Sequence, residues 1–352
     1  MVYYLDKVVY IKYVSNEDHL RECSVVKSRK MAKNPFFSND LGGIVLACVI
    51  LTVVISSTSE GFLSFFNINA NLQALSVLFV VGLAQMSVLS LGHFNLAIGS
   101  MGCLSAILIG LFMEVFGWPV IMSLLIGIFF AGLLGAIQGI LVDKSGINPF
   151  IITLALLSVY QGIAAIICKG KSFQNLSKEF MAGSIRNFGV LPLMFIVSII
   201  IGVVIFFIFR YLKIGRMLLA CGANPTAAIF SSINLDGVVV VGHTLSGVLC
   251  GLAGILQMMR FGSAQLSIGG DWMMKSFMAA ILGGTLLSGG KISTMGTLIG
   301  ALLVTLINNA LMIWGVSSYS VNIYLGMILI FAYILDKVRK IRGFKTPEKY
   351  GQ

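Results

Sequence analysis

Residues 188–209 read FGVLPLMFIVSIIIGVVIFFIF, a run of 22 residues without a charged side chain. At about 1.5 Å of rise per residue, a helix of this length crosses the roughly 30 Å hydrocarbon core of a bilayer. Comparable apolar runs recur along most of the chain, whose 352 residues are 58% hydrophobic and 11% charged. Soluble domains carry about 25% charged residues. The sequence therefore predicts an all-α, polytopic membrane protein.

Working outward from this run, we predict about ten transmembrane helices. The eighth is the weakest, because it begins beside Lys275 and ends in a glycine pair, which leaves a broken helix open. Glycines four positions apart, as in Gly135 and Gly139 or Gly247 and Gly251, favour close packing of helices in a membrane. The predicted spans are 42–58, 71–91, 95–114, 118–142, 147–168, 188–209, 237–259, 273–289, 293–314 and 319–335.

The net charge of +11 is concentrated at the chain ends and in alternate loops. With the amino terminus in the cytosol, 18 of the 24 basic residues fall on the cytosolic side, as the positive-inside rule requires. Ten spans return the carboxyl terminus to the cytosol, so we expect both termini there. We divide the chain into a basic amino-terminal segment (1–40), a membrane domain (41–336) and a basic tail (337–352). Basic ends near anionic lipid require no nucleic-acid partner.

Motifs for an energy source or for catalysis are absent from the sequence. The nearest match to a phosphate-binding loop, GTLLSGGKI at 284–292, lacks the first glycine and the final hydroxyl. His19, His93 and His243 are scattered, and the six cysteines show no metal-binding spacing. The 13 acidic residues lie almost entirely outside the spans, whereas ion-coupled transporters usually carry acids within them. A stand-alone secondary transporter or an intramembrane enzyme is therefore the less favoured alternative, and we expect no catalytic residue, metal or cofactor.

Polar residues in or near the spans are candidates for a translocation path. An interhelical hydrogen bond in a membrane is worth only about 0.6–2 kcal/mol, so structural pairing and path lining both stay open for each amide. A lysine at mid-bilayer costs about 2.5–3.5 kcal/mol, unless its side chain snorkels to the surface. The candidates are Asn95, Ser100, Thr153, Gln161, Lys275, Asn308, Asn309 and Asn322.

A polar island, GRMLLACGANPTAAIFSSIN at 215–234, separates two long apolar runs. Asn224 followed by Pro225 predicts a helix start, so the island divides into two short helices. The second helix carries small residues and a protruding Phe230, which suits insertion into a groove on another protein. The alternative, a helix lying on the membrane, is disfavoured because its polar face lacks lysines.

The island resembles the cytoplasmic coupling loop of permease subunits in ATP-binding-cassette importers, specifically the ribose or simple-sugar branch. Four further stretches resemble that family in order: 148–163, 246–256, 279–303 and 308–319. The resemblance implies a coupling loop (211–236) that contacts cytosolic ATPase subunits, an external solute-binding protein, and a second permease copy or paralogue in the lipid bilayer. The matching coupling positions are Gly215, Arg216, Ala220, Gly222, Asn224, Ala227, Ala228, Ser231, Ile233 and Asn234.

Departures from the family pattern affect the solute rather than the mechanism. Asn95 replaces a usual acid, Ser232 replaces a glycine in the coupling loop, and Lys275 stands in a segment where two acids are lost. As a hypothesis, Lys275 favours an anionic solute or a different binding-protein surface. A monosaccharide is the first expectation, with nucleosides and branched-chain amino acids as alternatives from neighbouring branches.

Overall fold

The computed structural model describes residues 39–59, 61–189, 191–316, 320, 323–324 and 326–327. These residues belong to a single compact unit. Most of the predicted amino-terminal segment, the basic tail and the greater part of the tenth predicted span lie outside the described residues.

Helices dominate the described residues, and one minimal hairpin pairs β1 (Asn187–Phe188) with β2 (Leu191–Pro192) in antiparallel register. The helices are α1 (Asn39–Thr58), α2 (Phe65–Leu89), α3 (Ile98–Glu114), α4 (Val120–Ser145), α5 (Pro149–Cys168), α6 (Lys178–Ile185), α7 (Leu193–Tyr211), α8 (Lys213–Ala223), α9 (Pro225–Phe230), α10 (Leu235–Phe261), α11 (Trp272–Leu282) and α12 (Thr294–Ile313).

Six of these helices are long and apolar enough to cross a bilayer: α2, α4, α5, α7, α10 and α12. The apolar parts of α1, α3 and α11 are shorter. The prediction of a single continuous helix over 273–289 is wrong, because α11 ends at Leu282 and the chain turns through Gly283 and Gly284, the latter with φ of +85°. The broken form that the sequence left open is the one found.

The predicted span 95–114 is also shorter than expected, since α3 starts at Ile98 after an irregular segment, 90–97. Irregular backbone at membrane depth is tolerated only where protein surrounds it. Ser90, Asn95 and Ala97 are all fully buried, which meets that condition.

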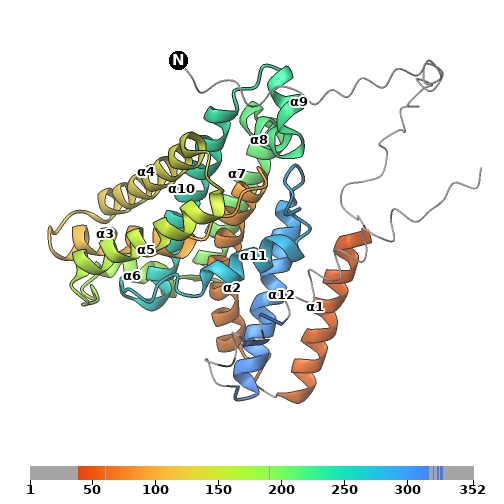
Figure 1. Ribbon diagram of the computed structural model, residues 1–352. Helices are drawn as coiled ribbons and strands as arrows, with labels where there is room; N and C mark the ends of the chain where they lie inside the picture. Colours follow the sequence, from red (N-terminus) through yellow and green to blue (C-terminus); the bar gives the residue numbers. More distant parts are fainter. Residues whose placement is uncertain are drawn as a thin grey trace, which may run out of the picture. The chain divides into compact units, whose positions relative to one another are not determined.

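The centre of the unit is built around α2 and α10. Every residue of α2 from Leu75 to Leu89 is buried, and α10 packs against α4, α2 and α3. Figure 1 shows α4 lying beside α10. A Cβ atom added to Gly135 would lie 2.4 Å from the His243 carbonyl oxygen, and one added to Gly247 would lie 2.3 Å from that of Ala131. The predicted close approach of glycine-lined helices is therefore confirmed.

By contrast, α4, α5 and α7 turn large apolar side chains outward, including Phe129, Ile166 and Phe207. Only a minor part of each of these three helices is buried inside the unit. Such surfaces are stable against lipid tails or another apolar helix, but not against water.

Candidate functional site

The polar island folds into α8 and α9, two short helices between α7 and α10, as the sequence predicts (Figure 1). The Asn224 side chain accepts a hydrogen bond of 3.0 Å from the Ala227 amide, and Pro225 occupies the first turn of α9. Asn234 caps α10 in the same manner through the Gly237 amide at 3.5 Å. These two asparagines therefore fix the directions of the chain entering α9 and α10.

The matched glycines of the island face the protein's own backbone. A Cβ atom at Gly215 would lie 2.3 Å from the Ile208 carbonyl oxygen, at the end of α7. A Cβ atom at Gly222 would lie 1.9 Å from the Ser90 carbonyl oxygen and 2.8 Å from the Gly290 nitrogen. The Gly290 amide also donates a 3.0 Å hydrogen bond to Ser90. We call this meeting of α8, the end of α2 and the loop 283–293 the glycine junction.

The outward face of the island includes two large apolar residues that the family pattern did not single out. Phe230 is 87% exposed and Ile229 is 57% exposed, whereas Ala228 beside them is buried. We call the outward side of α8 and α9, with Ile229 and Phe230, the coupling surface, after the role that the family resemblance implies. In the sequence, this surface was indicated by Phe230 and not by the family pattern of small residues.

The remaining island positions divide between the two sides. Arg216, Ala227 and Ser231 are exposed on the coupling surface, while Ala220 and Ile233 are half-buried. Cys221 is buried, and this burial raises the pKa of its thiol, so the thiolate is disfavoured there.

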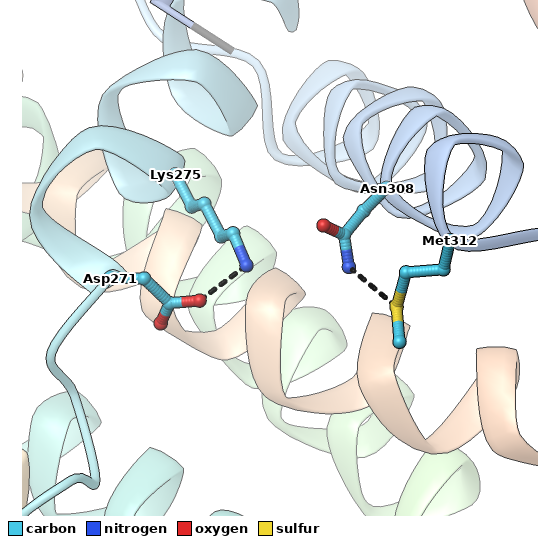
Figure 2. A network of polar contacts seen from close by, with 4 residues as sticks. All are labelled: Asp271, Lys275, Asn308 and Met312. Carbon is cyan, nitrogen blue, oxygen red and sulfur yellow. Dashed lines mark hydrogen bonds and ion pairs between the residues drawn. The ribbon is translucent and has the colours of Figure 1, made fainter. Parts of the chain in front are cut away.

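A second feature is a partly open hollow of about 80 Å³ lined by residues of α2, α10, α11 and α12 and by Asp271 just before α11. It brings together two of the predicted path residues, Lys275 and Asn308, whose side chains Figure 2 shows extending into the same space. Lys275 forms an ion pair with Asp271, one turn earlier. We call this the polar hollow. Its polar lining comprises Gln257, Arg260, Asp271, Lys275, Thr305 and Asn308.

Three other path candidates surround the irregular segment 90–97 instead. The Asn95 amide donates a 3.2 Å hydrogen bond to Ser246, and Thr153 donates one of 3.3 Å to the Phe94 carbonyl. Ser100 donates one of 3.0 Å to Ala97. These bonds hold the segment in place, and none of the three residues lines the polar hollow.

The last candidates are dispersed. Asn309 exchanges hydrogen bonds of 2.9 and 3.4 Å with Asn67 and so ties α12 to the start of α2. Gln161 is exposed on α5. Asn322 lies outside the described residues.

Histidines that are scattered in the sequence meet in space. The rings of His93 and His243 lie 5.8 Å apart, and Gln138 lies 2.8 Å from Nδ1 of His243. The sequence does not predict this cluster of His93, Gln138 and His243, because the segment 90–97, α4 and α10 each supply one of its residues.

Comparison with known proteins places this helical architecture in a class. Residues 67–333 match the model of the branched-chain amino acid transport system / permease component family. The chain is 30% identical over 317 residues to the D-allose transport system permease protein of Escherichia coli K12, covering 89% of this chain and 97% of that protein. It is 30% identical over 298 residues to the ribose import permease protein of Bacillus subtilis 168, covering 84% and 92%.

A third relative, the fructose import permease protein of Rhizobium meliloti, is 28% identical over 322 residues, covering 87% of this chain and 88% of that protein. No solved structure matches the chain. The fold and these similarities define a multi-pass permease of the inner membrane. The chain belongs to the branched-chain amino acid transport system / permease component family.

Proposed function

We propose that this chain is the membrane-spanning subunit of an ATP-binding-cassette importer that carries a monosaccharide or a sugar-like solute. Proteins named as D-allose, ribose and fructose permeases align with most of its length, which is the observation that carries the proposal. In this arrangement the chain supplies the path and no catalytic residue, and a separate cytosolic ATPase supplies the energy. The family description makes a branched-chain amino acid the alternative solute.

The coupling surface supports contact with that ATPase. An aromatic ring as exposed as Phe230 is unfavourable in water but stable in a groove of a partner. Gly222 and Gly215 anchor α8 on backbone atoms, so a force applied to the surface reaches α2 and α7 without intervening side chains. In this proposal both termini and the coupling loop are cytosolic, and ten spans cross the membrane.

The apolar outer faces of α4, α5 and α7 support a second permease copy or paralogue, with lipid covering the rest. A solute-binding protein delivers the solute at the side opposite the coupling surface. The path inside the membrane is proposed to include Lys275 and Asn308, which line the polar hollow.

The test is ATP-driven uptake by the purified complex of this chain and its ATPase in proteoliposomes, with radiolabelled sugars and the binding protein. Phe230→Asp should abolish both ATPase association and uptake, because it places a charge where a partner groove is proposed. It should leave thermal stability unchanged, because the ring makes little contact with its own chain.

Phe66→Asp is the matched control, since Phe66 is 83% exposed at the start of α2, away from α8 and α9. It should leave ATPase association intact. Equal ATPase association by the Phe230→Asp protein and the wild type would contradict the proposed coupling surface. Uphill uptake by this chain alone would contradict the proposed function.

A further inference from the structure

The polar hollow has an unequal balance of charge. Arg260, at the end of α10, and Lys275, on α11, contribute two cations, whereas Asp271 contributes one anion. Asp271 forms the ion pair with Lys275 and also interacts electrostatically with Arg260. The lining therefore carries one excess positive charge. Beside a low-dielectric helix bundle, such a charge attracts an anion more strongly than it would in water.

Neutral polar groups form the rest of the wall of the hollow. Thr305 and Asn308 on α12 and Gln257 on α10 supply a hydroxyl and two amides. The Asn308 amide makes only a 4.0 Å contact with the Met312 sulfur, a weak acceptor (Figure 2). A solute hydroxyl is a stronger partner for this amide, so the wall suits a polyhydroxylated compound.

In the Lys275–Asp271 ion pair, a solute anion can take the place of Asp271. Both residues lie one turn apart on the same short segment, the Asp271 side chain is 49% exposed, and that of Lys275 is 17% exposed. A partly exposed pair of this kind contributes little stability. Asp271 can therefore turn to solvent while the less exposed ammonium group of Lys275 keeps its need for an anionic partner.

We propose that the polar hollow binds a hydroxylated solute with a single carboxylate, a sugar acid, and that this carboxylate replaces Asp271 at Lys275. The inference rests on the proposed function and names its substrate class. Asp271 keeps its negative charge at the rim of the hollow after it turns to solvent, so the lining keeps a net charge of +1. A sugar phosphate, with about 1.5–2 negative charges, exceeds that balance, whereas one carboxylate matches it. A neutral aldose leaves the Lys275–Asp271 pair as it is and gains none of this charge pairing.

The experiment measures equilibrium binding to the full-length chain in nanodiscs, using matched pairs: D-glucose with D-glucuronate, D-galactose with D-galacturonate, and D-ribose with D-ribonate. For at least one pair, the acid should bind about tenfold or more tightly than its neutral parent. Added salt should weaken the binding of the acids and leave the binding of the neutral sugars unchanged. Lys275→Met should remove the preference, and Asp271→Asn should strengthen acid binding because the internal competitor is gone.

Lys275→Arg keeps the charge and should retain the preference, which separates loss of charge from misfolding. Lys171→Met, at an exposed loop lysine, should change nothing. The inference is overturned if no acid binds more tightly than its parent, or if Lys275→Met keeps the preference in a folded protein. Import of neutral sugars with exclusion of every acid would overturn it while leaving the proposed function standing. Failure of the coupled complex to import any of the six compounds would count against both.

Discussion

At the scale of single residues, Ser232 shows what a departure from a family pattern means physically. It follows α9 with φ of +57°, a left-handed conformation that costs an L-residue roughly 1–2 kcal/mol. The resembling family has glycine at this position, and glycine adopts such angles without strain. The chain therefore keeps the turn between α9 and α10 at a small cost in stability.

Ser232→Gly should raise the free energy of unfolding by up to about 1 kcal/mol, because relief of strain outweighs the greater freedom of glycine in the unfolded chain. Thermal unfolding of the purified protein measures this. The matched control is Ser231→Gly, at φ of −88°, which should be destabilising because the original residue is unstrained and its hydroxyl bonds the Ala227 carbonyl at 3.0 Å. A lower melting temperature for Ser232→Gly would refute the account of strain.

At the scale of elements, the glycine junction joins three segments that are far apart in the chain. Gly289 and Gly290, with φ of +83° and +77°, bring the loop 283–293 against Gly222 and Ala223 of α8. The family pattern predicts that Gly222 lies in the loop that contacts a partner, and this stays a prediction. The structure gives Gly222 close internal neighbours, so a substitution there also acts on the fold of this chain.

Gly222→Ala should lower the free energy of unfolding by about 1–3 kcal/mol, because the added methyl group meets backbone atoms that cannot rotate away. Gly237→Ala is the control within the same region, where the nearest atom would be 3.7 Å away. The two melting curves should separate clearly, and coupled uptake should fall only for Gly222→Ala. Indistinguishable curves would show that the junction is not tightly packed.

Local signals account for the part of the fold that the sequence predicts. Asn224 and Pro225 define the start of α9, and the four glycines of α4 and α10 define their contact. The lengths of α3 and α11 were not predictable in this way, because the backbone before Ile98 and after Leu282 is irregular where contacts with distant segments, which the local sequence does not show, help to satisfy it. Likewise, Arg260 of α10 and Asn308 of α12 join Lys275 in the polar hollow only because the fold brings these helices and α11 to one place.

At the scale of the whole molecule, the two candidate sites lie at different ends of α10. The coupling surface adjoins the end of α7 and the start of α10, whereas the polar hollow includes Arg260 near the end of α10. Since α10 is long enough to cross a bilayer, we propose that the two features lie toward opposite sides of the membrane.

Single cysteines should reveal this sidedness. In intact cells, a membrane-impermeant thiol reagent should label Phe66→Cys and leave Phe230→Cys unlabelled, whereas inverted vesicles should give the reverse. Both positions are highly exposed, so access by the reagent is not limited by packing. Labelling of both cysteines from one side would refute the proposed orientation and the cytosolic placement of α8 and α9.

The break after α11 has a mechanical consequence. This helix of 11 residues is about 16 Å long, with lining residues of the polar hollow at one end and the loop to the glycine junction at the other. Such a short helix can tilt as a rigid body and so transmit a movement from one end to the other. A tilt of about 10° around the Leu282 end would displace the Trp272 end by roughly 3 Å, a shift comparable to the length of a hydrogen bond. If the proposed ATPase rotates α8, a small rotation passed through the glycine junction would be sufficient to rearrange the groups proposed to bind the solute.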